Sequence, residues 1–246
     1  MRLATSTSPE VGSLDPDGVV LVLPIGSVEQ HSYHLPIGTD TLVVDAIAHR
    51  VEEQRPATVV LSPPLWFGAS AHHLGFPGST SIGGELLHKV VVEVLAAYHE
   101  STKISRFLVL NGHGGNDPGM KVAMELLRRR LPNVRGTAAN YWAAMFDGMK
   151  AAGVEVPPDG LGHACDVETS LVLAVAPELV KMDRLVPDPR RAEESPWLAR
   201  GWDFKETTDH GGVGDPTGAS AEWGEQMVGH AVARLARLCD QLLEER

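Results

Sequence analysis

The stretch that decides the fold is residues 106–130, which reads RFLVLNGHGGNDPGMKVAMELLRRR. A short apolar run, Arg106–Leu110, ends in a turn that contains three glycines. Apolar residues then recur three or four positions apart, which is typical of one face of a helix; they are Met120, Ala123, Met124, Leu127 and Leu131. A strand, a glycine-rich turn and a helix in this order form a basic unit of α/β proteins.

The same alternation extends along the rest of the chain. Further strands are predicted at Val19–Leu23, Thr58–Ser62 and Val134–Ala139. They are short and mostly apolar, which favours a parallel sheet covered on both faces over a half-solvated antiparallel one. Two further helical faces consist of Leu86, Leu87, Val90, Val91, Val94, Leu95 and Tyr98, and of Met227, Val228, Ala231, Leu235, Leu238 and Leu242. The sequence therefore predicts an α/β protein with a mainly parallel sheet.

Composition narrows the class of protein. The chain has 246 residues, 43% of them apolar, and a formal net charge of -11. We therefore expect one globular domain over residues 1–246 that binds neither nucleic acid nor an anionic membrane surface. No apolar stretch approaches the ~20 residues of a membrane-spanning helix. Two cysteines and the absence of a signal-peptide pattern predict a cytoplasmic location.

Residues 186–218 are rich in proline, glycine and charge, and their periodicity is weak. We interpret this stretch as a long loop over the sheet. Such loops in enzymes often carry lids or subunit contacts, and a simple solvated connection is the alternative.

A first group of polar residues follows the first predicted strand. Glu29 and His31 are two positions apart, so in an extended segment their side chains point the same way. Asp40 lies where the next helix is expected to begin. Taken alone, the local sequence also fits an alternative in which Asp40 is a helix cap and Glu29 and His31 are surface loop residues.

His113 lies in the sequence Asn-Gly-His-Gly-Gly-Asn, directly after the strand Arg106–Leu110. This position places it at the carboxyl end of the sheet, on the rim where Glu29 and His31 emerge. Gly114 and Gly115 allow the backbone to approach a ligand closely. A phosphate-binding loop is the competing interpretation, but neither the glycine spacing nor a lysine of the P-loop kind supports it. We interpret His113 as a metal ligand.

A third group, His163 and Glu168, precedes an apolar helical run. A carboxylate entering an apolar helix either reaches solvent or binds a cation. The pKa range of histidine suits His163 to proton transfer, although a helix cap beside a solvated histidine is the alternative. The three groups offer imidazole and carboxylate ligands of the kind that bind Zn, Mn or Fe, and Asp40 can bridge two divalent ions.

The order of these motifs resembles the creatininase (creatinine amidohydrolase) family. The resemblance rests on Glu-x-His, an Asp nine residues after that His, Asn-Gly-His-Gly-Gly-Asn, and His-Ala-x-x-x-Glu-Thr-Ser. It extends over residues 24–224 and includes Phe76–Thr80 and Gly214–Ala219. The resemblance implies a three-layer α/β/α sandwich, two divalent metal ions per subunit, hydrolysis of a C–N bond in a small amide, and a homo-oligomer, often a hexamer.

Carried over by position, the resemblance implies a role for each site residue. One metal would be bound by Glu29, Asp40 and His113, and the other by His31, Asp40 and Glu168. His163 would protonate the leaving nitrogen. Trp142 would form an aromatic wall for the substrate, beside Gly114 and Gly115.

Two departures from creatininase itself concern the substrate. Creatininase has a glutamate where this chain has Gly115, so Glu168 is expected to complete the second metal site. It also has a flap tryptophan where this chain has Asp159, which argues against creatinine as the substrate.

We therefore expect a dinuclear metal hydrolase acting on a small, cyclic amide rather than on a peptide bond. The alternatives are a peptide-cleaving maturation enzyme of the mycofactocin type and a non-catalytic metal- or ligand-binding protein. Four further histidines could line the site, although ordinary loop histidines are more common: His34, His72, His73 and His210.

Overall fold

The computed structural model describes residues 1–157, 160–188 and 201–245. At its centre is a four-stranded sheet in the order β2-β1-β3-β4, in which every neighbouring pair is parallel. The strands are β1 (Val20–Ile25), β2 (Val59–Leu61), β3 (Arg106–Asn111) and β4 (Arg135–Asn140). The predicted parallel sheet is confirmed.

Alternate residues of the central strands enter two different hydrophobic cores. Val22 of β1 and Leu108 of β3 belong to one core, whereas Leu21 and Phe107 belong to the core on the opposite face. Strands that are buried on both faces need apolar residues at every position, which explains the unbroken apolar runs. The edge strand β4 differs from this expectation, because all of its residues are only half-buried.

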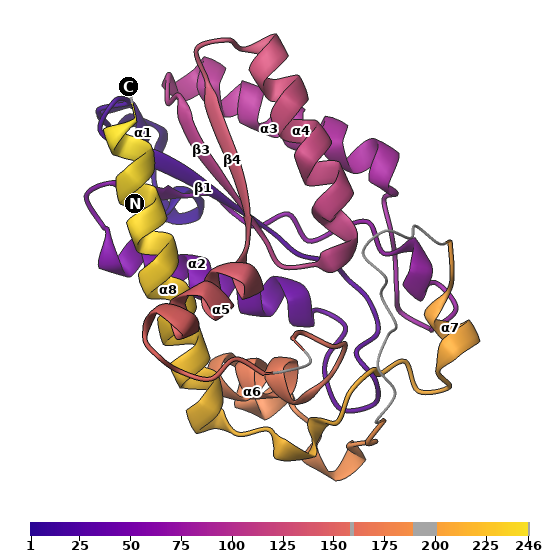
Figure 1. Cartoon of the computed structure of the whole chain (residues 1–246). Helices are drawn as coiled ribbons and strands as arrows, with labels where there is room; N and C mark the ends of the chain where they lie inside the picture. Colours follow the sequence, from indigo (N-terminus) through magenta and orange to yellow (C-terminus); the bar gives the residue numbers. More distant parts are fainter. Residues whose placement is uncertain (158–159, 189–200, 246) are drawn as a thin grey trace.

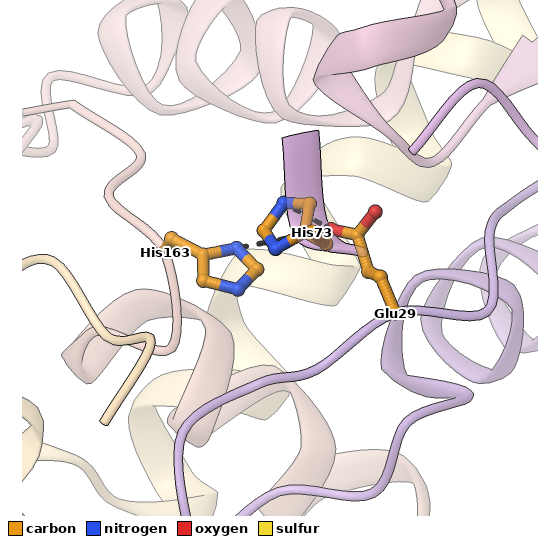
Figure 2. A group of neighbouring side chains, drawn as sticks. All are labelled: Glu29, His73 and His163. Carbon is orange, nitrogen blue, oxygen red and sulfur yellow. Dashed lines mark ion pairs between the residues drawn. The ribbon is translucent and has the colours of Figure 1, made fainter. Parts of the chain in front are cut away.

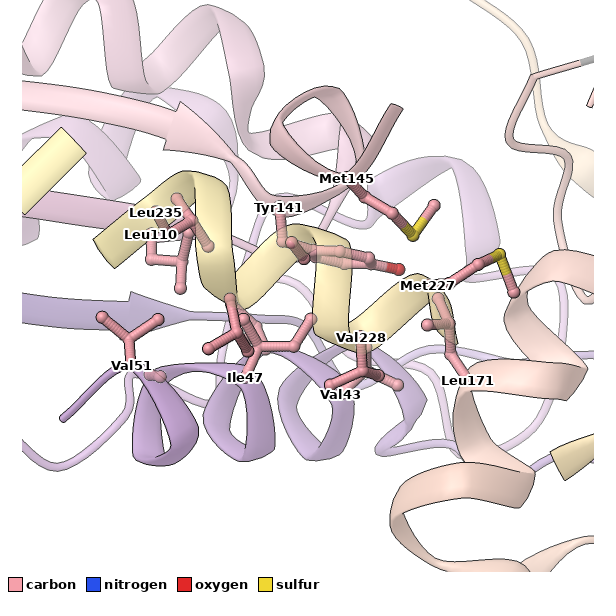
Figure 3. Packing of buried hydrophobic residues seen from close by; sticks show 14 of the residues in the cluster. Val43, Ile47, Val51, Leu110, Tyr141, Met145, Leu171, Met227, Val228 and Leu235 are labelled. Atoms are coloured by element: carbon pink, nitrogen blue, oxygen red, sulfur yellow. The ribbon is translucent and has the colours of Figure 1, made fainter. Parts of the chain in front are cut away.

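Helices cover both faces of the sheet and make the predicted three-layer α/β/α sandwich (Figure 1). On one face lie α3 (Gly84–Thr102) and α4 (Asp117–Arg130). On the other lie α2 (Thr39–Gln54), α5 (Tyr141–Ala151), α6 (Asp166–Val175) and α8 (Ala221–Glu244). Figure 3 shows the core between these four helices and the sheet, where Tyr141 lies among Ile47, Leu110 and Val228.

The remaining helices are short and lie in the connections. The α-helices are α1 (Ser8–Gly12) and α7 (Phe204–Thr207). The 3-10 helices are η1 (Leu3–Thr5), η2 (Ala71–His73), η3 (Gly114–Asn116), η4 (Pro177–Leu179), η5 (Met182–Arg184) and η6 (Pro216–Gly218). In the part of the chain that the structure describes, no helix is both long and apolar enough to cross a membrane.

One apolar residue of the predicted α3 face was assigned wrongly. Leu86 is 51% exposed, whereas Leu87, Val91 and Leu95 are fully buried. The buried stripe of α3 therefore begins at Leu87, and Leu86 in the first helical turn points away from the sheet.

The strand register brings the carboxyl ends of three strands side by side. Ile25, Asn111 and Asn140 are paired across β1, β3 and β4, so these strands end side by side. β1 continues two residues past its predicted end, because Pro24 and Ile25 still pair with Leu110 and Asn111 of β3. The loops that follow β1 and β3 therefore start at the same height, which brings their polar side chains together.

The predicted long loop, residues 186–218, is described in part, since residues 189–200 lie outside the described residues. Its second half contains α7 and returns to the protein body through isolated bridges from Val213 to His163 and from Gly214 to Asp188. Trp202 and Phe204 line the cleft above the sheet edge, so this half is more than a solvated connection.

Candidate metal centre

The five predicted metal ligands converge at the carboxyl edge of the sheet. Glu29 and His31 lie in the loop after β1, Asp40 in the first turn of α2, His113 directly after β3, and Glu168 in the first turn of α6. All five are buried. Burial excludes the alternative that Glu29 and His31 are surface loop residues.

Asp40 lies between two imidazoles. Its Oδ1 atom is 3.1 Å from His31 Nε2, and its Oδ2 atom is 3.1 Å from His113 Nδ1. The residue at the cap position of α2 is Gly38, and no side chain caps this helix. The interpretation of Asp40 as a helix cap is therefore wrong, and its two oxygens face nitrogens of two different imidazoles.

Glu29 is held by residues of two other segments. Its Oε2 atom is 3.2 Å from His113 Nδ1 and accepts a short hydrogen bond from the Ser70 hydroxyl, which in turn contacts the Ser27 hydroxyl. Its Oε1 atom is 3.3 Å from His73 Nε2. This carboxylate therefore has a fixed orientation toward the centre.

Glu168 is buried rather than solvated, which excludes one of the two alternatives for this residue. Its Oε2 atom accepts a hydrogen bond from Ala164 N–H at 2.6 Å and lies 3.9 Å from His31 Nε2. Ala164 adopts a left-handed φ of 53°, a conformation that costs energy for a residue with a side chain. The backbone conformation of the turn before α6 therefore points the Ala164 N–H at Glu168.

The imidazoles of His31 and His113 each present one defined ring nitrogen to the centre. His31 Nδ1 is 3.2 Å from the backbone carbonyl of Glu29, to which it donates, so Nε2 faces Asp40. His113 Nε2 lies near the Ala69 carbonyl at 3.3 Å, so its Nδ1 faces Glu29 and Asp40. A hydrogen bond from the second ring nitrogen is the usual support of a metal-binding histidine.

The charges of these buried carboxylates and imidazoles favour the binding of a cation. In the described part of the chain, the ion-pair partners of Glu29, Asp40 and Glu168 are all histidines, not lysine or arginine. Burial lowers the pKa of His31, but Asp40 and the other carboxylates outweigh it and raise this pKa to about 10. Burial also raises the pKa of Glu168 to about 7.

These residues fit divalent cations. His31 Nε2 and Asp40 Oδ2 are buried atoms without a hydrogen-bond partner. Glu29, His31 and Asp40 can bring one ligand atom each within 4.8 Å of one another, and so can His31, His163 and Glu168. A mixed nitrogen and oxygen set of this kind suits zinc or manganese.

His163, the predicted proton-transfer residue, lies beside the same centre. Its Nε2 atom is 2.7 Å from the backbone carbonyl of Gln30, and its Nδ1 atom is 3.9 Å from Glu29 Oε1. Burial and the nearby charge of His31 hold the pKa of His163 well below its usual range. His163 is therefore neutral, and its hydrogen lies on Nε2, which donates to the Gln30 carbonyl.

A cleft of about 1270 Å³ opens above the centre. The predicted substrate-binding residues Trp142, Gly114 and Gly115 line it. At Gly115, a Cβ atom would lie 2.4 Å from the Ala69 carbonyl oxygen and 2.5 Å from His113 Nε2, so no side chain fits there. Asp159, the second departure noted in the sequence, lies outside the described residues.

Two aromatic residues of the cleft were not predicted. Phe204 stacks on His73 with ring centroids 4.2 Å apart, and Trp202 packs against Phe204 at 4.7 Å. Both lie in the stretch that shows little periodicity, so no local pattern marks them. They supply aromatic surface on a different segment from Trp142.

The four further histidines of the sequence analysis differ in position. His73 is buried beside Glu29, and His72 lines the cleft. His34 is buried and contacts the Thr169 hydroxyl at 2.8 Å, away from the cleft lining. His210 contacts Asp188 within its own chain at 3.2 Å.

Comparison with known proteins agrees with this geometry. A family model described as creatinine amidohydrolase matches residues 4–239. The chain belongs to the creatininase family. Among solved structures, a creatininase aligns over 100% of this chain and 98% of its own, with a TM-score of 0.86 and 27% identity. The chain is thus a creatininase-family hydrolase.

Two curated relatives of this chain are named for different substrates. A mycofactocin precursor peptide peptidase of Mycolicibacterium smegmatis is 36% identical, over 94% of this chain and 87% of its own length. A creatinine amidohydrolase of Pseudomonas putida is 30% identical, over 92% and 89%.

The metals of related structures match the donor set. One creatininase structure at 27% identity and a TM-score of 0.84 is described as the Zn-Zn type, and another at 26% identity and the same TM-score as the Mn form.

Proposed function

We propose that this chain hydrolyses an amide bond of a short peptide at a dinuclear metal centre. The observation that carries the proposal is its 36% identity, over 94% of the chain, to a mycofactocin precursor peptide peptidase. The cleft supports the same conclusion, since 1270 Å³ exceeds the ~300–1,000 Å³ typical of small-molecule pockets. The sequence alone favoured a small cyclic amide; the relatives favour the peptide alternative.

The proposed ligand sets are those that the family resemblance implies, and the observed distances are compatible with them. Glu29, Asp40 and His113 would hold one cation, zinc or manganese, and His31, Asp40 and Glu168 the other, with Asp40 shared. Such ions would supply a water of lowered pKa as the nucleophile and would polarise the amide carbonyl. The protein holds the ligand atoms in place through the Ser70 and Ala164 hydrogen bonds.

His163 would carry the proton. Its Nε2–H donates to the Gln30 carbonyl, so the Nδ1 lone pair is free on the side of Glu29. A neutral imidazole in this state can take a proton from the attacking water at Nδ1. It can then deliver that proton to the leaving nitrogen, which is a poor leaving group as an anion.

The cleft wall would orient the substrate. Gly114 and Gly115 leave their backbone accessible beside His113, so an extended chain can approach closely. The rings of Trp142 and Trp202 line the same cleft and offer flat apolar surfaces to side chains of the peptide.

A substrate panel separates this function from its rivals. Zinc- or manganese-loaded protein is incubated with a mycofactocin precursor peptide, a set of short unrelated peptides, creatinine and other lactams, and products are identified by mass spectrometry. Peptide cleavage that is abolished by a chelator supports the proposal. Turnover of lactams without peptide cleavage would replace it with the small-amide function. Bound metal without turnover of any compound would favour a binding protein.

The homo-oligomer, with a hexamer as its expected form, stays a prediction. Light scattering of the metal-loaded protein measures it directly.

A further inference from the structure

Gln30 lies between two proposed ligands in the sequence, yet its own side chain serves other partners. It is 5% exposed. Its amide oxygen accepts a hydrogen bond from Ser32 N–H at 2.9 Å, and its amide nitrogen donates to the Gly211 carbonyl at 2.9 Å. The amide nitrogen is also 2.8 Å from His73 Nδ1.

The two backbone partners fix which end of the amide is oxygen and which is nitrogen. A backbone N–H only donates and a backbone carbonyl only accepts, so a flipped amide would place like groups against each other at both positions. The approach to Gly211 requires a glycine, since φ is 85° and a Cβ would lie 1.9 Å from Gln30 Oε1. The orientation of Gln30 is therefore set independently of the histidines.

This orientation determines where His73 carries its hydrogen. The amide nitrogen of Gln30 has only hydrogens to offer, so His73 Nδ1 must accept. Neutral His73 then carries its hydrogen on Nε2, which is 3.3 Å from Glu29 Oε1. Glu29, His73 and His163 are close enough to hold a cation, as Figure 2 illustrates, but an Nε2 that bears a hydrogen cannot coordinate one.

The backbone of Gln30 has the same effect on His163. The Gln30 carbonyl only accepts, so His163 Nε2 at 2.7 Å must donate to it. The 3.1 Å approach of the Gln30 amide nitrogen to His163 Nε2 brings two donors together and is not a hydrogen bond. His163 Nδ1 is left with its lone pair toward Glu29.

We propose that Gln30 is a positioning residue that places the hydrogen of both His73 and His163 on Nε2. The His73 N–H is thereby directed to Glu29 and orients this carboxylate, so His73 supports a ligand without being one. The lone pair of His163 Nδ1 is kept for the reacting proton; this second part rests on the proposed function.

The hydrogen positions are measurable without a substrate. Two-bond ¹H–¹⁵N correlation spectra of ¹⁵N-labelled, zinc-loaded protein distinguish the two neutral histidine forms. Signals are assigned by their loss in His73→Asn and His163→Asn. We expect both residues to have the hydrogen on Nε2. A hydrogen on His73 Nδ1, or a metal-bound His73 Nε2, would overturn the proposal whatever the activity.

The Gln30→Glu variant tests the cause. A carboxylate only accepts, so the His73 hydrogen should move to Nδ1, whereas His163 should be unchanged because its partner is a backbone carbonyl. Loss of the Glu29 orientation should lower kcat about 10- to 100-fold with little change in KM. Gln54→Glu makes the same chemical change at an exposed position and should leave both readouts as in the wild type. An unchanged His73 signal in Gln30→Glu contradicts the proposal.

The readouts separate failure of the proposed function from failure of this inference. Protein that cleaves no substrate but shows both hydrogens on Nε2 refutes the function and retains the role of Gln30. Active protein with the hydrogen on His73 Nδ1 supports the proposed function and refutes the role of Gln30. If Gln30→Glu does not fold, the wild-type spectrum still decides.

Discussion

Four histidines surround the centre, and they form two regions with opposite electrostatics. His31 and His113 face Asp40 and Glu29, and these carboxylates raise the pKa of both imidazoles despite burial. His73 and His163 face the amide and carbonyl of Gln30, and burial lowers the pKa of both. The rings of His31 and His163 are only 4.3 Å apart. Hydrogen-bond partners, rather than distance from the centre, therefore separate the histidines of raised pKa, which are the proposed ligands, from those of lowered pKa.

The largest expected effect comes from the shared ligand of the carboxylate region. Asp40→Ala should lose both metal ions, because each Asp40 oxygen faces a different imidazole. Activity should fall by about 10⁴-fold or more, or about 5.5 kcal/mol of transition-state stabilisation. Elemental analysis of the purified variant measures the metals. Glu168→Gln is the matched comparison and should lose only one ion; two equivalents retained by Asp40→Ala would refute its bridging role.

His163→Ala tests the second region, which contains the neutral histidines His73 and His163. We expect kcat to fall by ~10²- to 10⁴-fold while two metals remain bound, because we propose that His163 transfers a proton and is not a metal ligand. His31→Ala, from the other region, should lose a metal along with activity. An activated substrate whose leaving group needs no proton should restore the rate of His163→Ala. Metal loss in this variant would instead make His163 a ligand and remove the distinction between the regions.

The stability of the metal-free protein should depend on pH in a way that reflects the carboxylate region. Glu168 has its pKa raised from 4.5 to about 7, and His31 from 6.5 to about 10. In both cases the folded state binds protons more tightly than the unfolded state, so stability is present at low pH and lost as pH rises. Between pH 7 and pH 9, above the range in which the lowered pKa values of His73 and His163 act in the opposite direction, we expect the melting temperature of chelator-treated protein to fall by roughly 5 °C or more.

The zinc-loaded protein is the control for this pH series. Metal binding requires deprotonated ligands, so its stabilisation should grow over the same range. Parallel curves for the two forms would mean that the histidines and Glu168 do not bind the metals.

The smallest expected effect concerns the glycine turn after β3. Gly115→Ala should lower the free energy of unfolding by about 1–3 kcal/mol and weaken metal binding, because its Cβ would press on the Ala69 carbonyl and on His113. Gly114→Ala is the matched control, since nothing lies within 4 Å of a Cβ at Gly114. Chemical denaturation and metal titration of both variants make the comparison. Equal behaviour of the two variants would show that this turn does not constrain His113.

The sequence predicted the features that follow from local patterns. Apolar runs mark the parallel strands, and polar residues that directly follow β1 and β3 must meet at one edge, which is why Glu29, His31 and His113 were predicted together. Glu168 was predicted because a carboxylate entering an apolar helix needs a partner. The ligand assignments themselves stay predictions.

What the sequence did not predict depends on contacts between distant segments. Gln30 contacts His73 and Gly211, which are 43 and 181 positions away. No spacing rule marks such contacts, and the state of a histidine ring is set only by its folded neighbours. Asp40 shows the same limit, since a helix cap and a metal ligand have the same local sequence, and only the fold separates them.

The contact between Gly211 and Gln30 has a consequence for engineering. The stretch from Trp202 to Gly211 carries aromatic residues of the cleft wall at one end and the carbonyl that holds Gln30 at the other. Grafting this loop from a relative to change the substrate range would also replace the anchor of Gln30. A graft that keeps Phe204, which stacks on His73, and residues 208–212, which hold Gln30, would leave those contacts in place while the rest of the wall is exchanged. Substrate specificity and the position of the histidine hydrogens can be redesigned separately only if the grafted residues do not include those that hold Gln30.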